Sequence, residues 1–226
     1  MRKGSGKSTA PKVFFYTGTF LFILVAAISV IGLLTGSINS ATASMAFTLA
    51  FSLTLSFLVI SYLLHKGKSL KRIVKELGLS RKALNRRTIG YGLLLFAIYV
   101  IIIFAIATIS SITGVQINSN VQQTIGGYPI WALVFLSIIA PLNEEIAFRG
   151  FLVPRIGVLF SGLLFAVLHF GYGSVSEIVI ALWFGLAGGY VFKRTKSLYP
   201  SLMTHILVNS ITAIAISAIP MLIMVH

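Results

Sequence analysis

The chain has 226 residues, of which 57% are hydrophobic, and its formal net charge is +14. Its mean hydropathy of +0.98 is higher than a soluble domain of this length carries. There are no cysteines, which excludes a disulfide framework and thiol chemistry. The basic residues stand in short blocks between apolar runs. This distribution is typical of membrane topology, so we expect no nucleic-acid partner.

Seven apolar stretches have about the length of a membrane span, which takes about 20 residues of helix. They lie near residues 13–36, 41–64, 88–110, 129–153, 157–172, 175–192 and 199–222. The sequence therefore predicts an all-α fold, a polytopic membrane helix bundle of about seven transmembrane helices in contact with lipid. We divide it into a cytoplasmic basic tail (1–12), N-terminal spans (13–128) and a C-terminal helical core (129–226).

The charge distribution predicts the orientation of the bundle. Basic blocks occupy the tail, the segment 66–87 and the turns after the fourth and sixth stretches, whereas the loops at 37–40, 111–128 and 173–174 carry no Lys or Arg. Because basic loops stay in the cytoplasm, we expect a cytoplasmic N-terminus and an extracytoplasmic C-terminus in the cell membrane. Within 66–87, apolar residues recur at helical spacing, which predicts a cationic amphipathic helix on the anionic inner leaflet.

Acidic residues are rare, and two of them are adjacent inside the fourth stretch. Glu144 and Glu145 are half of the chain's four acids, the others being Glu76 and Glu177. An ionisable residue inside a membrane span is costly and by default marks a functional site. Glu145 precedes Arg149 by four residues, the favoured order for a helical ion pair, whereas Glu144 points about 100° away. Glu144 therefore suits a general base; the alternative is that both acids only lock helices together.

The later stretches add two histidines and an asparagine. The midpoint between the two glutamates and His169 falls at Gly157, close to Pro154, and both residues favour a turn. A reversal there would put the glutamates and His169 at equal depth, each about 18 Å from the turn. His205 and Asn209 are four residues apart and share a face of the last stretch, with His205 only about 10 Å from its start.

Together these groups are suited to activating water against a carbonyl carbon. That reaction needs a base, a partner that orients the water and donors for the oxyanion. Glu144, His169 and His205 would also be the ligands if a metal were bound, although they come from separate stretches and no HExxH motif occurs. We favour a site without a tightly bound metal, with zinc as the alternative.

Three motifs stand in order on the fourth, fifth and seventh stretches. They read Glu144-Glu145-x-x-x-Arg149, Phe165-x-x-x-His169 and His205-x-x-x-Asn209. In this order they resemble the CPBP family of CAAX-type prenyl proteases and bacteriocin-processing or self-immunity (Abi) proteins. The resemblance covers about residues 130–210 and implies an intramembrane endopeptidase that cleaves a membrane-associated peptide or protein. The short chain is more similar to bacterial members, for which peptide maturation or bacteriocin immunity is the expected setting.

The resemblance also implies a role for each residue of the motifs. The catalytic set would be Glu144, His169, His205 and Asn209, supported by Glu145 and Arg149. The first glutamate would be the general base, the first histidine would help to hold water, and the second histidine and the asparagine would stabilise the oxyanion. Metal-dependent and metal-free glutamate mechanisms both remain open. The alternative function is a non-enzymatic immunity protein or a small proton-coupled transporter, although a transporter would usually show repeated halves.

Overall fold

The computed structural model describes residues 40–114, 126–172 and 174–224, with scattered positions between 13 and 36. Within these ranges the chain is helical and has no strand, which confirms the predicted all-α fold. The predicted tail and most of the first predicted span lie outside the described residues. The described elements are α2 Ser40–His65, α3 Leu70–Glu76, η1 Arg81–Ala83, α4 Arg86–Thr113, α6 Ile130–Glu145, η2 Ile146–Leu152, α7 Val153–Leu168, η3 His169–Tyr172, α8 Val175–Thr195 and α9 Tyr199–Met224.

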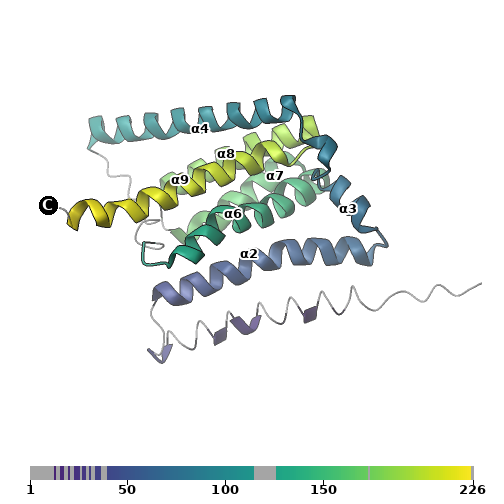
Figure 1. Cartoon of the computed structure of the whole chain (residues 1–226), viewed down its shortest axis with the longest axis horizontal. Coiled ribbons are helices and arrows are strands. Elements are labelled where there is room, and N and C mark those ends of the chain that lie inside the picture. Colours follow the sequence, from purple (N-terminus) through teal and green to yellow (C-terminus); the bar gives the residue numbers. More distant parts are fainter. Residues whose placement is uncertain are drawn as a thin grey trace, which may run out of the picture.

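The long helices form a bundle with a layered order. Figure 1 shows α2 and α4 on opposite outer sides, with α6, α7, α8 and α9 between them. The helix α9 packs against both α4 and α6, and α7 packs closely along α8. On the outer helix α4, Ile101 and Phe104 are 65% and 69% exposed, as expected of side chains that face lipid.

Five stretches of the described residues are long and apolar enough to cross a membrane. They are Thr42–His65, Arg86–Thr113, Ile130–Leu168, Val175–Thr195 and Tyr199–Ser217. The predicted polytopic bundle is thereby confirmed, and the third of these stretches covers most of both the fourth and the fifth predicted spans. The fifth is shorter than a full crossing, because α7 continues only over residues 158–168 after the chain reverses at Gly157.

This reversal is the hairpin that the sequence predicts. Gly157 has φ 85° and ψ 170°, a backbone conformation that is essentially restricted to glycine. Beyond the turn, Ser161 Oγ donates to the carbonyl oxygen of Phe148 at 2.8 Å. The ring of Phe165 meets that of Phe148 edge-on, with centroids 5.2 Å apart. The two arms of the hairpin are therefore antiparallel neighbours.

Close packing of α7 on α8 depends on paired glycines. A Cβ added at Gly185 of α8 would lie 2.9 Å from the Cα of Gly162 on α7, so the two backbones approach directly. This contact holds the middle of α8 against α7, the helix that ends directly before His169.

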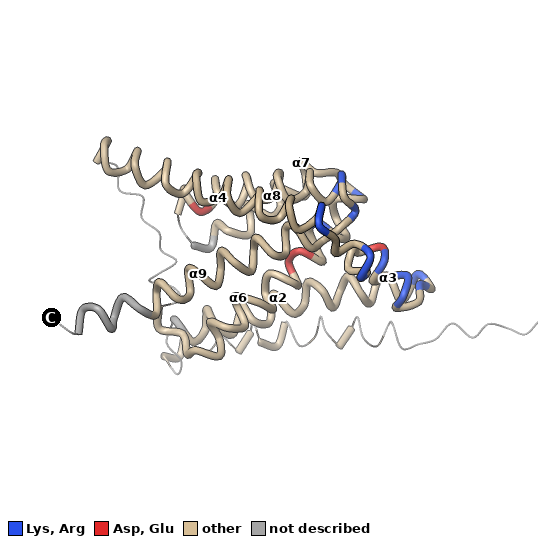
Figure 2. The backbone as a smooth tube through the Cα atoms, turned by 45° about the horizontal axis from the view of Figure 1, so that its top comes forward, with Lys and Arg blue, Asp and Glu red and all other residues tan. Residues whose placement is uncertain are grey.

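Basic side chains gather toward one end of the bundle. Figure 2 shows Lys and Arg around α3 and the adjoining ends of the long helices, whereas the far end of the described helices carries none. Unlike these basic residues, Arg149 is buried inside the bundle, with 1% of its surface exposed. The bundle thus has the charge segregation that the sequence pattern predicts.

The basic segment 66–87 differs from its prediction. It is not one amphipathic helix, since α3 ends at Glu76 and Gly78, with φ 75°, separates it from the short η1 turn. Ile73 and Leu77 are buried in the protein core. Part of the apolar face therefore packs on the bundle and not on lipid.

Hydrogen bonds fasten this segment to the connection between α8 and α9. They are Leu198 N–H to Gly78 O at 3.0 Å, Tyr199 OH to Leu79 O at 2.9 Å and Ser197 Oγ to Ala83 O at 2.8 Å. The start of α9 is thereby held against the end of the bundle that carries the basic residues.

Candidate active site

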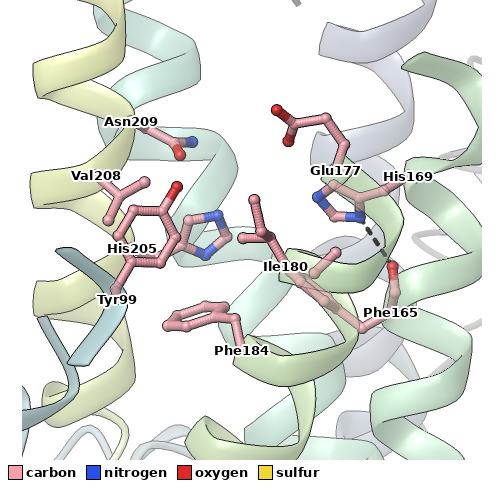
Figure 3. Close-up of a pocket in the computed structure, with 10 residues that line it drawn as sticks. Tyr99, Phe165, His169, Glu177, Ile180, Phe184, His205, Val208 and Asn209 are labelled. Atoms are coloured by element: carbon pink, nitrogen blue, oxygen red, sulfur yellow. Dashed lines mark hydrogen bonds between the residues drawn. The ribbon is translucent and has the colours of Figure 1, made fainter. Parts of the chain in front are cut away.

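The four residues predicted to be catalytic line one cavity. Glu144, His169, His205 and Asn209 surround a space of about 140 Å³ between α6, α8, α9 and the end of α7. A smaller compartment of about 70 Å³, drawn in Figure 3, shares the two histidines and the asparagine. The structure therefore brings these residues together, while their roles in catalysis stay a prediction.

Glu145 and Arg149 form a buried ion pair beneath this cavity. Their side chains are 0% and 1% exposed, and Arg149 Nη1 lies 3.1 Å from Glu145 Oε1. The guanidinium also donates through Nη2 to the Phe184 carbonyl oxygen at 3.2 Å and stacks over the Phe165 ring at 4.1 Å. Such pairing offsets the cost of burying both charges. The predicted pair is thus present, as the spacing of four residues indicates.

His205 lies between the two glutamates. Its Nδ1 is 3.1 Å from Glu145 Oε1, and its Nε2 is 3.8 Å from Glu144 Oε2. Because a carboxylate accepts, the Nδ1 atom carries a hydrogen, and Nε2 is directed toward Glu144. The Glu144 side chain is 24% exposed, whereas that of Glu145 is fully buried. The two adjacent acids therefore occupy different environments, as predicted from their angular separation.

His169 reaches the cavity from the first residue of η3. Its Nδ1 donates to the carbonyl oxygen of Phe165 at 2.9 Å, the bond dashed in Figure 3. A carbonyl can only accept, so this contact also leaves the lone pair of the neutral ring on Nε2. The ring packs on Phe165, with centroids 4.7 Å apart. Both histidines thus carry a hydrogen on Nδ1 and direct Nε2 away from that contact.

Asn209 joins the cavity wall to α6. Its Nδ2 donates to the carbonyl oxygen of Leu136 at 3.1 Å. One of the two amide hydrogens is therefore committed to holding α9 against α6, and the other remains for a ligand.

Residue counts along the sequence put His205 about 10 Å and the acids about 18 Å from the ends of their stretches. This difference in depth does not occur in the structure. Gly150 of η2 and Leu198 before α9 both abut the backbone of Leu77–Gly78, so they are at one level. From there Glu144 is six residues along one helix and His205 seven along the other, about 10 Å in each case. The hairpin extends past the start of α9, and this extension brings His205 and the acids to the same depth.

The residues after the acids form a π-helix. The wider turn of η2 begins at Ile146, directly after the acids, and contains Arg149. Single π-turns inside helices are frequently found at functional sites.

Upstream, Pro141 is buried within α6 and lacks the N–H that would bond to the Ser137 carbonyl. Asn143 fixes this part of α6 to α2 through Ser52 and Ser56, at 3.2 and 2.6 Å.

Two polar residues shared by both compartments were not predicted. Tyr99 of α4 and Glu177 of α8 line both compartments. The signal for Glu177 was present, since it is the third acid inside a predicted span. Tyr99 stands in a helix that is apolar on every side, where the sequence does not indicate which face meets the cavity.

The residues named as metal ligands do not form a metal site in this geometry. Among the described residues, no three His, Asp or Glu side chains come together in a way that could hold a metal ion. We therefore derive no step through a metal.

The fold and the cavity define a multi-pass α-helical membrane protein with a carboxylate and two imidazoles facing one another inside the bundle. Residues 126–211 match the family model described as type II CAAX prenyl endopeptidase Rce1-like. This match confirms the resemblance to the CPBP family over the segment that contains the three motifs.

One relative is the protein named "Uncharacterized protein YpbD" of Bacillus subtilis (strain 168). It is 32% identical over 84 residues, which make up 36% of this chain and 43% of that protein. The chain thus matches less than half the length of this relative. No solved structure matches the chain.

Proposed function

We propose that the chain is an intramembrane endopeptidase that hydrolyses a peptide bond of a membrane-associated peptide or protein. The observation that carries this proposal is the convergence of Glu144, His169 and His205 on one cavity inside a membrane-type bundle. The family match over residues 126–211 supports the same reaction class. A buried polar cavity is costly in a membrane protein, which favours a functional role for it.

The first step is activation of a water molecule. Glu144 accepts one proton of the water while the water oxygen attacks the carbonyl carbon of the scissile bond. The Nε2 lone pair of His169 accepts the hydrogen bond of the second proton and orients the water. Nε2 of His205 lies 3.8 Å from Oε2 of Glu144, so the second imidazole borders the same carboxylate.

The oxyanion of the tetrahedral intermediate needs hydrogen-bond donors. A neutral His205 offers only a lone pair at Nε2, because its hydrogen is held by Glu145. Donors at the cavity include the second amide hydrogen of Asn209 and the hydroxyl of Tyr99. We assign the oxyanion to these two groups, with His205 contributing when it is protonated.

Collapse of the intermediate completes the reaction. The carbon–nitrogen bond breaks, the carbonyl re-forms, and Glu144 returns its proton to the leaving amine. The base is thereby regenerated as a carboxylate. Glu145 and Arg149 support the site without touching the reacting atoms, since they lie below His205 in a fully buried pair.

The orientation follows from the positions of the charges. The basic end of the bundle faces the cytoplasm in this proposal, which places the N-terminus inside and the C-terminus outside. For a bacterial member, we propose peptide maturation or bacteriocin self-immunity as the biological setting. Peptides with a prenylated C-terminus are the alternative substrates to test against unmodified peptides.

The test is a cleavage assay with purified protein in detergent. Peptides with and without a prenyl group are incubated with the wild type and with Glu144→Ala, and products are identified by mass spectrometry. We expect cleavage that requires Glu144. The same assay after exhaustive chelation, with metal content measured on the sample, should retain activity. Lost activity that returns with zinc, at about one metal per chain, would make a metal mechanism necessary.

A non-enzymatic immunity protein or a proton-coupled transporter predicts a different result. Neither would cleave any peptide, and a transporter would move protons across liposome membranes in a manner that depends on Glu144. Equal product yields from the wild type and Glu144→Ala would show that a contaminant is responsible and would remove the proposal.

A further inference from the structure

The guanidinium of Arg149 is enclosed inside the bundle, since only 1% of its side chain is exposed. It faces Oε1 of Glu145 at 3.1 Å and lies over the rings of Phe165 and Phe184, 4.1 and 4.8 Å from their centroids. A buried charge of this kind has no water to move into, so the neighbouring residues determine where it lies. The position of Arg149 therefore depends on the shape of the helices around it.

Helix α8 receives the guanidinium between Phe184 and Gly188. Nη2 of Arg149 donates to the Phe184 carbonyl oxygen at 3.2 Å. Within a helix this carbonyl also accepts the N–H of the residue four positions later, which is Gly188, and its second lone pair remains for the guanidinium. A Cβ added at Gly188 would lie 3.3 Å from Nε and 3.5 Å from Nη2 of Arg149. The missing side chain thus leaves the space through which Arg149 reaches the carbonyl.

We propose that Gly188 is a positioning residue of the candidate active site and acts through Arg149. For its effect on catalysis, this inference rests on the proposed peptidase function. Oε1 of Glu145 faces Arg149 and His205 at once, each at 3.1 Å. A side chain in place of the Gly188 hydrogen displaces the guanidinium, and the shared oxygen either follows it or loses it. The contact of Glu145 with Nδ1 of His205 changes in both cases, and Nε2 is redirected relative to Glu144.

Gly188 also has an ordinary structural role to consider. A small residue lets two membrane helices approach each other, and a Cβ at Gly188 would lie 3.2 Å from Cβ of Ser201 on α9. That role predicts a less stable protein when alanine is introduced, whatever residue replaces Arg149. The proposed role predicts that the effect of alanine depends on the head group of Arg149.

Gly189 provides a matched control on the same helix. Its added Cβ would be similarly crowded, 3.1 Å from Cγ1 of Val158 and 3.3 Å from Cγ2 of Val153. Both valines belong to α7, and neither lines the cavity. Gly189→Ala therefore imposes a similar packing strain without contacting Arg149.

The first experiment observes the His205 ring directly. Isotopically labelled histidine marks only four residues of the chain, and their imidazole signals are recorded by NMR in detergent. The signals of His205 are identified by their loss in His205→Gln. In Gly188→Ala we expect the Nδ1 and N–H signals of His205 to shift, whereas in Gly189→Ala they should keep their wild-type positions. With a cleavable peptide, Gly188→Ala should lower kcat by about tenfold with little change in KM, and Gly189→Ala by no more than about twofold.

A second pair of variants tests the route through Arg149. Lysine has no Nη2 atom and a more compact head group, so Arg149→Lys relieves the crowding at Gly188. Adding Gly188→Ala to Arg149→Lys should therefore change the unfolding temperature and the His205 signals little, although the same substitution in the wild type changes both. If Gly188→Ala alone does not fold, a double variant as stable as Arg149→Lys supports the proposal, and a double variant that also fails to fold overturns it.

The outcomes separate this inference from the proposed function. Unchanged His205 signals in folded Gly188→Ala overturn the positioning role and leave the peptidase proposal intact. Equal shifts in Gly188→Ala and Gly189→Ala also overturn it, because they would show a general response to crowding in α8. The absence of any cleavage that depends on Glu144 overturns the peptidase proposal, and the NMR comparison then still decides whether Gly188 sets the contact of His205 with Glu145.

Discussion

The Nδ1 atom of His205 lies 3.1 Å from Oε1 of Glu145, a carboxylate with no exposed surface. The same oxygen also faces Arg149 at 3.1 Å, so one carboxylate holds an imidazole and a guanidinium at once. This arrangement fixes the His205 ring with Nε2 toward Glu144. Glu145 is therefore a positioning residue, and Glu144, with its exposed edge in the cavity, is the acid that can meet water.

The two acids should respond differently to substitution. Glu144→Ala should abolish cleavage and leave the protein folded, because its side chain is partly exposed and outside the buried ion pair. Glu145→Ala and Arg149→Ala should each lower the yield of folded protein, since each leaves a buried charge unpaired at a cost of about 3–5 kcal/mol. Thermal unfolding in detergent and the cleavage rate are measured on the same preparations.

A conservative substitution provides the control for this comparison. Glu145→Gln keeps an acceptor for Nδ1 of His205 but removes the charge opposite Arg149, so it should be less stable than the wild type. Turnover by Glu144→Ala that is lower than that of the wild type but still substantial would show that Glu144 is not the base. Unchanged stability of Glu145→Ala would show that the buried pair does not hold the helices.

Tyr99→Phe should lower kcat by about 10²-fold with little change in KM, because the loss of one oxyanion donor acts on the transition state. The phenyl ring retains the contact with Trp183, where the centroids are 6.3 Å apart. Tyr91→Phe is the matched control, since Tyr91 is on the same helix but does not line the cavity. Equal effects of the two substitutions, or a change confined to KM, would remove Tyr99 from the oxyanion site.

Local spacing accounts for what the sequence could predict about the site. Glu145 and Arg149 are one helical turn apart, so their pairing needs no knowledge of other helices. The hairpin is also local, because Gly157 provides a conformation that other residues resist. Equal residue counts on the two arms then place His169 near the acids without further information.

The remaining parts of the site depend on contacts between distant segments. In a helix that is apolar on all sides, periodicity does not show which face meets a cavity, so Tyr99 could not be placed there. The depth of His205 depends on how far the hairpin extends past α9, which is set by packing against Leu77–Gly78. The break of the basic segment into α3 and η1 depends on the same contact.

Gly78→Ala should destabilise the protein more than Gly67→Ala. Both glycines have φ 75°, a conformation that costs an L-residue about 1 kcal/mol or more. A Cβ at Gly67 meets open space, whereas at Gly78 it would lie 2.9 Å from the backbone nitrogen of Leu198 and the carbonyl oxygen of Lys196. The difference between the two thermal unfolding temperatures therefore measures how strongly the contacts of Gly78 with Lys196 and Leu198 resist displacement at the start of α9. Equal shifts would show that these contacts adjust without a loss of stability.

A reporter fused after residue 226 should be read as extracytoplasmic, and one inserted near Arg81 as cytoplasmic. The shortness of α7 does not change this expectation, because α8 returns the chain to the basic end whether α7 crosses fully or not. The fusions are compared by an enzyme that is active on one side of the membrane only. A cytoplasmic C-terminus would mean that α9 does not cross the membrane.

Glu76 should stabilise the basic end of the bundle in a manner that depends on pH. It pairs with Lys68 and with Arg155 of the hairpin, the latter at 3.1 Å. The hydrogen bond from Lys68, together with that from Arg155, holds the pKa of Glu76 below its ordinary value of 4.5. A carboxyl group whose pKa is lower in the folded state contributes stability above its unfolded-state pKa, and this contribution is lost as pH falls through the folded-state pKa.

Glu76→Gln should therefore lower the unfolding temperature at pH 7, and the difference from the wild type should vanish as pH falls below about 4.5 toward the lowered pKa. The pairs are partly exposed, so the effect is on the order of 1 kcal/mol or less and shrinks with added salt. Lys75→Ala, a change on the same helix, is the control and should show no such pH dependence. A difference between Glu76→Gln and the wild type that persists unchanged at low pH would mean that packing, and not charge, connects α3 to the hairpin.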